Sequence, residues 1–205
     1  MERGPDSDRT GTERLGVFGG TFDPPHIGHL VMATDVLEAL SLDRVLMVCA
    51  GEPWQKVGVV EVSPATDRLA MLEAAADGLD GLEVCDIEVR RSGPTYTVET
   101  LEELALLYPG AELHLVLGAD AASGIPTWHD HERLADLCRI AVVDRPGSSI
   151  AVPDGLEVQR VDAPRLEVSS TELRQRVADG RSIRFLVPDP VISVIEGRGL
   201  YAGRR

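Results

Sequence analysis

The sequence predicts an α/β fold in which a parallel sheet carries helices on both faces. Short apolar runs alternate along the 205 residues with longer segments whose apolar residues recur at helical spacing. Several of the runs are apolar throughout, which is typical of strands buried on both faces. These two observations predict a doubly wound sheet, in which ligands bind beyond the carboxyl ends of the strands.

The composition fits one domain of this kind. Hydrophobic residues make up 43% of the chain, enough for a sizeable core, and the formal net charge is −14. This charge argues against a general nucleic-acid binder or a binder of anionic membranes, and no run is long enough to span a bilayer. The three cysteines lie in apolar runs without metal-binding spacing, so we expect reduced thiols and a cytoplasmic protein. The oligomeric state stays open, with a homo-oligomer as one option.

The elements follow in order. Residues 1–13 are polar and predict a disordered tail; 14–205 predict a single domain, with 169–205 as a short C-terminal helical appendage. Apolar runs predict strands at 15–18, 44–50, 82–89, 112–117, 139–143 and, more weakly, 156–161. Helical spacing predicts helices at 30–40, 68–76, 97–107, 131–137, 170–178 and 188–196. The alternation indicates a Rossmann-like sheet.

Helix boundaries can also be predicted. Ser63 and Pro64 form an N-cap and a first-turn proline for the second helix, and Pro109 stops the third. Either Thr95 or Thr97 is a candidate cap for that third helix. A glycine follows each of the two closing helices as a C-terminal stop.

The stretch 19–29, after the first strand, organises the rest of the chain. Its two glycines let the backbone turn sharply and approach a ligand closely, and Pro24 and Pro25 delay the start of the helix. His26 and His29 then stand three residues apart in the first turn, which puts both imidazoles on one face. Helix amides and the helix dipole favour an anion there, so the stretch predicts a polyphosphate site. Each feature alone is common; the whole string is specific.

This string, Gly-Gly-Thr-Phe-Asp-Pro-Pro-His-Ile-Gly-His, resembles the signature of the nucleotidylyltransferase superfamily, a His-x-Gly-His pair after the first strand. In its longer form it is similar to the bacterial nicotinate mononucleotide adenylyltransferases, and the resemblance spans about residues 15–201. It implies transfer of the adenylyl group of ATP to nicotinate mononucleotide in NAD biosynthesis. The transfer would be a direct in-line attack, with Mg²⁺ carried by the ATP phosphates and no metal site made from side chains.

Three further stretches at the same sheet edge fit the mononucleotide. Pro53-Trp54-Gln55-Lys56 follows the second strand, and Lys56 could hold a phosphate as a point charge. The family usually has His where Gln55 stands. The aperiodic span 51–62 predicts a loop able to move over substrate. The resemblance also implies that Thr97 bonds the nicotinate carboxylate and that Trp128 stacks on the pyridine ring.

Three more stretches fit ATP. Asp120 ends the segment Gly118-Ala119-Asp120; the resemblance implies that it binds the adenosine ribose or supports metal, while the plainer interpretation is a turn cap. The segment 168–174 offers hydroxyls, amides and Arg174 to an anion, or simply an N-cap and a surface arginine. The resemblance implies that it holds the triphosphate and that Arg145 approaches the nucleotide.

The resemblance thus implies a complete set of site residues. The catalytic ones are His26, His29, Lys56 and Arg174. The mononucleotide contacts are Thr21, Lys56, Thr97 and Trp128. The ATP contacts are Gly19, Gly20, Thr21, Phe22, His26, His29, Asp120, Arg145, Ser169, Ser170, Thr171 and Arg174.

Other functions remain open from the sequence. Phosphopantetheine adenylyltransferases share the histidine pair and the Ser-Thr-x-x-Arg helix but are shorter and lack the Asp…Trp segment. Nicotinamide mononucleotide is an alternative substrate. Class I aminoacyl-tRNA synthetases also carry His-Ile-Gly-His, but this short chain has no Lys-Met-Ser-Lys-Ser match. A nucleotide-binding regulator without catalysis is the alternative from a different class.

Overall fold

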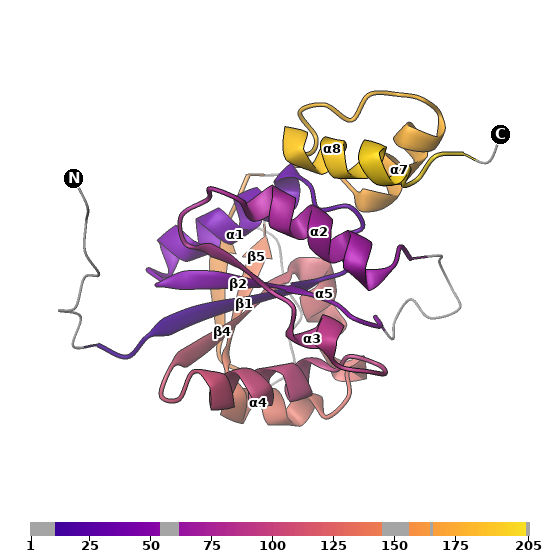
Figure 1. Cartoon of the computed structure of the whole chain (residues 1–205). Helices are drawn as coiled ribbons and strands as arrows, with labels where there is room; N and C mark the ends of the chain where they lie inside the picture. Colours follow the sequence, from indigo (N-terminus) through magenta and orange to yellow (C-terminus); the bar gives the residue numbers. More distant parts are fainter. Residues whose placement is uncertain (1–10, 54–61, 145–155, 165, 204–205) are drawn as a thin grey trace, which may run out of the picture.

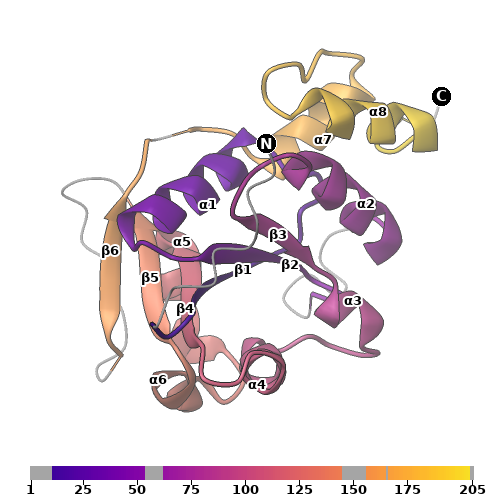
Figure 2. The ribbon, with the colours of Figure 1, turned by 60° about the vertical axis from the view of Figure 1, so that its left-hand side comes forward.

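A computed structural model describes residues 11–53, 62–144, 156–164 and 166–203. Its strands form one parallel sheet in the order β3-β2-β1-β4-β5-β6. The strand bounds are β1 Arg14–Gly20, β2 Arg44–Cys49, β3 Leu82–Cys85, β4 Glu112–Gly118, β5 Arg139–Asp144 and β6 Val158–Asp162. The strand order reverses between β1 and β4, so the switch point, where such sheets bind ligands, lies beside the end of β1 (Figure 2).

Helices cover both faces of this sheet (Figure 1). The α-helices are α1 Ile27–Ala39, α2 Ala65–Ala76, α3 Ile87–Arg90, α4 Thr97–Leu107, α5 Ala119–Ser123, α6 Leu134–Leu137, α7 Ser170–Ala178 and α8 Asp189–Arg198. Two 3₁₀ turns, η2 Ile125–Thr127 and η3 His131–Arg133, precede α6. The predicted doubly wound α/β fold is confirmed.

Alternate residues of each strand supply the two cores. Val17 of β1 packs in a cluster with Leu101 of α4 and Leu134 of α6, whereas its neighbour Phe18 packs in a second cluster with Val36 of α1. This alternation follows from the two-residue period of a strand, and the helices bury both faces as a parallel sheet requires. Figure 1 shows α1 and α2 on one side of the sheet and α4 on the other.

The C-terminal helices pack against α2 rather than against the sheet. Met71 of α2 shares a third apolar cluster with Leu173 of α7 and Ile195 of α8. Gly180 and Gly199 follow these two helices with positive φ, as expected for residues that end helices. For α8 the predicted end is wrong: the helix continues to Arg198, so Gly197, the glycine that follows the predicted range, lies inside it, and Gly199 ends it instead.

The third predicted strand is too long. β3 stops at Cys85 instead of Val89, because Cys85 pairs with Val48 near the end of β2 and later residues would have no partner strand. Their backbone groups are satisfied locally instead, as when Arg90 N–H donates to the Asp86 carbonyl at 3.0 Å. Residues 86–90 therefore turn into α3.

The caps predicted for α2 and α4 are also wrong, and two elements differ from expectation. Pro64 is the N-cap of α2, while the Ser63 amide donates to Asp23. Tyr96 is the N-cap of α4, and the Thr95 hydroxyl donates to the Glu52 carbonyl, so neither predicted threonine caps that helix. The helix predicted at 131–137 is η3 followed by α6, and α5 has no predicted counterpart.

The three cysteines form no disulfide. Burial raises the pKa of the Cys49 thiol to about 11 and that of Cys138 to about 12, which makes both poor nucleophiles at neutral pH. Across the described residues, none of the helices combines the length and the hydropathy needed to cross a membrane.

Candidate active site

β1 ends in a turn whose two glycines have different surroundings. A Cβ on Gly20 would lie 2.8 Å from Cζ of Phe22, which has a φ of 50° and folds its ring back against the turn. Around Gly19 no described atom lies within 4 Å of the position that a Cβ would take. Gly20 therefore makes room for a protein side chain, whereas Gly19 leaves open space at the carboxyl end of β1.

The turn continues through a cis Asp23–Pro24 peptide bond into the two predicted histidines. His26 is the N-cap of α1, and its backbone N–H donates to Nδ1 of His29 at 3.1 Å. The two rings stack with their centroids 3.7 Å apart. Because Nδ1 accepts this bond, a neutral His29 carries its proton on Nε2.

Burial controls the chemistry of His26. The residue is 7% exposed, and desolvation lowers the pKa of its imidazole to about 4, so it is neutral at physiological pH. Its Nδ1 is buried and has no hydrogen-bond partner among the described residues. A Cβ on Gly28 would lie 3.0 Å from this Nδ1, so the glycine of His-x-Gly-His is what lets the ring fold against the helix.

A first cavity opens beside this turn on the α4 face of the sheet. Thr21, Thr97 and Trp128, which the sequence assigns to one ligand, all line it. The Trp128 Nε1 atom is buried and has no partner among the described residues. The ring of Tyr96, at the start of α4, lies 4.4 Å from that of His129, and both also line the cavity. The structure thus brings three distant segments to one pocket.

A buried carboxylate in this cavity has no counterpart in the sequence prediction. Glu88 of α3 is 8% exposed and accepts a 2.7 Å hydrogen bond from the Thr100 hydroxyl. Arg91 donates to the same hydroxyl at 3.1 Å. Burial raises the pKa of Glu88, although this hydrogen bond opposes the shift. Nothing in the sequence around Glu88 distinguishes it from an ordinary surface acid.

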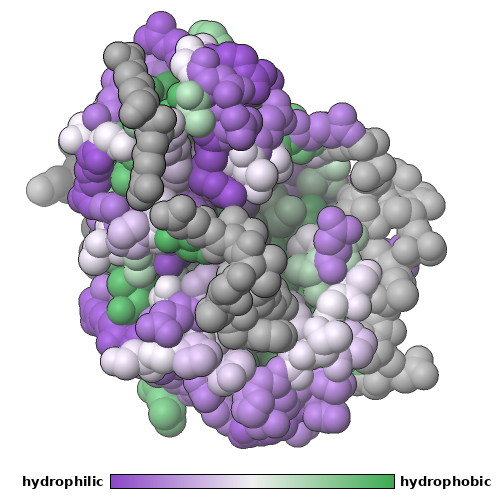
Figure 3. All heavy atoms as spheres, turned by 90° about the vertical axis from the view of Figure 1, so that its right-hand side faces the viewer, coloured by the Kyte–Doolittle hydropathy of each residue, from purple (hydrophilic) through white to green (hydrophobic). Residues whose placement is uncertain are grey.

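A second cavity lies on the opposite face of the sheet, between α1 and the ends of β4 and β5. Gly28, Met32, Asp120 and Val143 are among its lining residues. Val143 belongs to the apolar cluster under α1, whereas the strand residues around the first cavity belong to the cluster under α4. Asp120 is exposed in the first turn of α5, whose N-cap is Gly118. Figure 3, which looks onto this edge of the sheet, shows a hollow with apolar side chains at its floor.

The start of α7 is tied directly to the glycine–histidine turn. Arg174 donates to the Asp23 carbonyl at 2.8 Å, and the Ser170 hydroxyl donates to the Pro24 carbonyl at 2.9 Å. Ser169 caps α7 by accepting from the Glu172 amide, and Thr171 accepts from Arg174. The plainer interpretation as a simple cap therefore holds for Ser169 alone, and Arg174 is not a free surface side chain.

Asp23 is the centre of this junction, and sequence reasoning missed its role. Its carboxylate is 2% exposed and accepts from the Ser63 amide at 3.2 Å and from the Tyr201 hydroxyl at 2.7 Å. Burial and this carboxylate raise the pKa of Tyr201. The signal was available, because Asp23 stands inside the recognised string and the two prolines after it have no backbone N–H to offer its carboxylate.

Some predicted residues cannot be placed. Lys56, Arg145 and most of the span 51–62 lie outside the described residues. Among the residues that are described, no group of three or more His, Cys, Asp or Glu side chains could hold a metal ion.

Comparisons with known proteins agree with this geometry. The cytidylyltransferase-like family matches residues 17–176. A probable nicotinate-nucleotide adenylyltransferase of Saccharopolyspora erythraea is 45% identical over 193 residues, covering 93% of this chain and 90% of its own. A protein of the same description from Roseiflexus sp. is 47% identical over 197 residues, covering 91% and 97%. The chain belongs to the nicotinate-nucleotide adenylyltransferase family.

Solved structures of this family share its fold. Plasmodium falciparum nicotinic acid mononucleotide adenylyltransferase, solved in complex with NaAD, superposes with a TM-score of 0.74 at 17% identity, over 92% of this chain and 97% of its own. A putative nicotinate-nucleotide adenylyltransferase from Vibrio parahaemolyticus gives a TM-score of 0.66 at 22% identity, over 93% and 96%.

Proposed function

We propose that this protein transfers the adenylyl group of ATP to nicotinate mononucleotide in NAD biosynthesis. The 5′-phosphate of the mononucleotide attacks the α-phosphorus of ATP, a new P–O–P bond forms, and the bond to the β-phosphate breaks. The products are nicotinate adenine dinucleotide and pyrophosphate. Membership of the family supports this reaction, as does the arrangement of the two cavities.

The single observation that carries the proposal is the position of the glycine–histidine turn between the two cavities. Gly19 and Gly20 line the first cavity, and Gly28 lines the second. A reaction that joins two nucleotides through their phosphates requires those phosphates to meet at one point. The turn, with its buried unpartnered His26 Nδ1, lies at that point.

The first cavity suits nicotinate mononucleotide. Trp128 offers an indole face for stacking, with apolar neighbours on β4. Thr97, in the first turn of α4, offers a hydroxyl beside helix amides, a combination that favours a carboxylate. In this assignment Thr21 and Lys56 hold the attacking phosphate, although Lys56 lies outside the described residues.

The second cavity suits the adenosine of ATP, with Asp120 at its rim for the ribose hydroxyls. The triphosphate then extends to the turn, toward Phe22 and the two histidines. It also reaches the α7 segment that carries Ser169, Ser170, Thr171 and Arg174, which hydrogen bonds join to the turn. Arg145, also outside the described residues, follows β5 and is assigned to the same nucleotide.

Catalysis by this site consists of positioning and charge stabilisation. A neutral His29 donates from Nε2 and Arg174 supplies a fixed positive charge, so both stabilise the charge that builds up on the leaving phosphates. Neither group has to form a bond to phosphorus, which agrees with a direct transfer. Mg²⁺ bound to the ATP phosphates would neutralise part of their charge, and the exposed Asp120 carboxylate is an oxygen ligand of the kind that this ion takes beside substrate phosphates.

The test is a pyrophosphate-release assay with ATP and each of three acceptors: nicotinate mononucleotide, nicotinamide mononucleotide and phosphopantetheine. We expect the highest kcat/KM with nicotinate mononucleotide. A higher value with either of the other acceptors would replace the proposed substrate. Binding of ATP without turnover of any acceptor would indicate the non-catalytic regulator instead.

A further inference from the structure

Arg68 of α2 is a charged residue in an apolar interior. It is 1% exposed and lies on the same helix face as the fully buried Met71 and Leu72. Arginine is rarely buried so completely unless its donors are satisfied, because removing its charge from water is unfavourable. Its position therefore requires specific partners.

These partners are backbone carbonyls from three segments of the chain. The guanidinium donates to the carbonyl oxygens of Thr21 at 2.9 Å, Gly51 at 2.8 Å and Ser63 at 2.9 Å. A fourth contact, at 3.6 Å, reaches the sulfur of Cys49. The planar fork of arginine fixes the directions of these bonds, so the three segments are held in a defined arrangement.

Two of the three segments form the wall of the first cavity. Thr21 lines it, and so do Ala50 and Pro53 on either side of the Gly51–Glu52 pair. Arg68 is not among the lining residues. The guanidinium therefore reaches the cavity only through the backbone that it holds.

The Gly51–Glu52 pair is also held from its other side. A Cβ on Gly51 would lie 2.2 Å from the carbonyl oxygen of Glu88, so the two backbones are in close contact. The Glu52 carbonyl accepts from both the amide and the hydroxyl of Thr95, at 3.2 and 3.3 Å. With Arg68 on one side and this segment on the other, the chain leaving β2 has little freedom where it passes the cavity.

We propose that Arg68 is a positioning residue for the mononucleotide half of the active site. Its buried guanidinium sets the position of the Thr21 backbone relative to the chain that leaves β2, and thereby the shape of the cavity that receives the mononucleotide phosphate. The inference rests on the proposed function for the identity of the ligand. Arg68 contacts none of the residues that line the second cavity, so we expect the mononucleotide to be affected more strongly than ATP.

The first experiment compares steady-state kinetics of Arg68→Gln and Arg68→Lys with those of the unmodified protein. Gln removes the charge and the fork; Lys keeps the charge but cannot reach all three carbonyls at once. We expect Arg68→Gln to raise the KM for nicotinate mononucleotide by about 10- to 100-fold, by analogy with the loss of the hydrogen bonds that orient metal ligands. The mononucleotide KM of Arg68→Lys should lie between those of the unmodified protein and Arg68→Gln, and the KM for ATP should rise by a clearly smaller factor in both variants.

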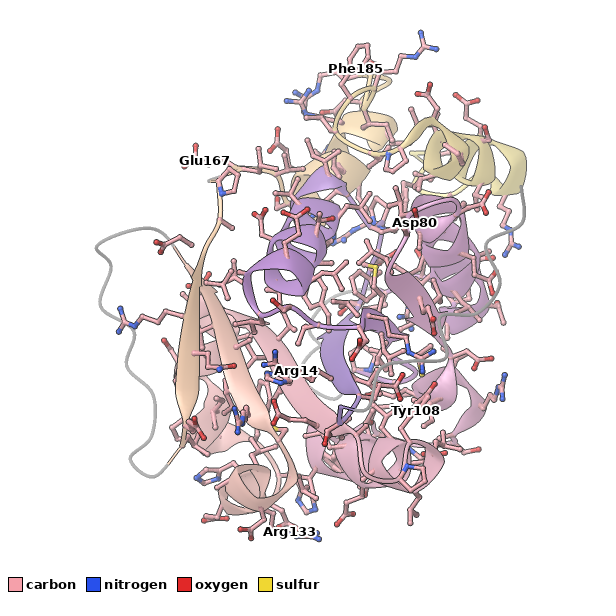
Figure 4. The ribbon with its side chains drawn as sticks, turned by 90° about the vertical axis from the view of Figure 1, so that its left-hand side faces the viewer. Arg14, Asp80, Tyr108, Arg133, Glu167 and Phe185 are labelled. Atoms are coloured by element: carbon pink, nitrogen blue, oxygen red, sulfur yellow. The ribbon has the colours of Figure 1, made fainter. Side chains whose placement is uncertain are left out.

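Arg14 provides a matched control. Its guanidinium also donates to a backbone carbonyl, that of Leu40 at 2.6 Å, but from the opposite end of β1, which faces the viewer in Figure 4. Arg14→Gln should lower the melting temperature without changing either KM. A rise in both substrate KM values by the same factor in Arg68→Gln, or an unchanged mononucleotide KM, would overturn the positioning role.

A second measurement does not depend on activity. Hydrogen exchange in Arg68→Lys, or in Arg68→Gln if it folds, should increase in peptides covering residues 19–22 and 50–53 and stay unchanged in residues 118–124. The same change in exchange in all of these peptides, relative to the unmodified protein, would also overturn the proposal. If the unmodified protein transfers no adenylyl group to nicotinate mononucleotide, the proposed function is wrong, and the exchange result still decides whether Arg68 fixes these segments.

Discussion

His29 has two nitrogen atoms with different roles. Its Nδ1 accepts a hydrogen bond from the His26 amide and so holds the turn, and in the proposed function its Nε2 donates to the phosphates. His29→Ala removes both, whereas His29→Asn keeps an acceptor near the Nδ1 position and lacks the reach of Nε2. We expect both variants to lose about 100- to 1,000-fold in kcat, as for other donors to transition-state charge.

Rate measurements at saturating substrates would check this, with His131→Ala on the exposed η3 turn as a control that keeps full activity. Recovery of most of kcat in His29→Asn would assign His29 to holding the turn rather than to the chemistry.

Substrate choice depends on Thr97 and Trp128. Stacking on an indole does not distinguish a carboxylate from an amide on the pyridine ring, because both present the same face. The Thr97 hydroxyl together with the helix amides beside it can distinguish them, since a carboxylate accepts from every donor whereas an amide turns its NH₂ group toward one of them. Trp128→Ala should therefore weaken nicotinate and nicotinamide mononucleotides alike. Thr97→Val should weaken mainly the acid, by about 10- to 100-fold for one lost bond to a charged group.

The ratio of kcat/KM for the two mononucleotides measures this preference. Thr127→Val is the control, because the Thr127 hydroxyl bonds the Gly124 carbonyl outside the cavity. An unchanged ratio in Thr97→Val would show that other donors select the acid.

Individual site residues could be predicted from the sequence where they belong to a specific string, as His26 and His29 do. They could not be predicted where a side chain contributes to the site by bonding backbone carbonyls. Arg68 had a local signal that was overlooked: it stands three and four residues before the buried Met71 and Leu72, and so on the apolar face of its helix. Its carbonyl partners lie in three separate segments, which no helical pattern reveals.

Among the elements, α7 joins the C-terminal helices to the site. Arg174 and Arg176 lie two residues apart on it, yet only Arg174 reaches the glycine–histidine turn, through the Asp23 carbonyl; Arg176 pairs with the exposed Glu172. Arg174→Ala should therefore raise the KM for ATP and lower kcat, together by about 10- to 1,000-fold in kcat/KM. Arg176→Ala, which removes an equal charge from the same helix, should change neither by more than about twofold.

Titration of ATP at a fixed mononucleotide concentration would compare the two variants. Equal effects in both would mean that net charge on α7, rather than the position of Arg174, attracts the nucleotide.

The elements themselves were largely predictable, because apolar runs and helical spacing reflect burial on a sheet with two covered faces. The exception at 86–90 shows the limit of that reasoning. A sequence run records that residues are apolar but not where the neighbouring strand ends, and β3 stops one residue before the end of β2. The same holds for the caps, since Ser63 and Thr95 bond segments that are distant in the sequence.

For the molecule as a whole, His26 links stability to pH. Its pKa is about 4 in the folded protein and 6.5 in a model peptide, which approximates the unfolded chain. As the pH falls from 6.5 toward 4, the imidazole of His26 is protonated in the unfolded chain before it is protonated in the folded protein. The contribution of His26 to the free energy of unfolding is therefore fully present above pH 6.5 and is lost between pH 6.5 and pH 4. Between about pH 7.5 and pH 5 the loss should be about 2 kcal/mol.

Urea unfolding at the two pH values, in the unmodified protein and in His26→Asn, would isolate this contribution, because all other titrating groups are common to both. The pH-dependent loss should be about 2 kcal/mol smaller in the variant. The same loss in both proteins would show that His26 becomes protonated without unfolding.

The placement of the two cavities on opposite faces of one sheet also decides how the substrates can arrive. The two cavities share none of their lining residues, so we expect that neither nucleotide blocks the route of the other. Order of addition is then expected to be random, with each substrate binding to the empty enzyme, and initial rates should give intersecting double-reciprocal plots. Binding of one nucleotide only after the other, measured directly by titration, would instead mean that the first to bind builds the site for the second. Parallel plots would mean that pyrophosphate leaves before the mononucleotide binds, which contradicts a direct transfer. The dinucleotide product occupies both cavities at once. To leave, it must withdraw one of its two halves past the glycine–histidine turn, a step that neither substrate needs in order to bind.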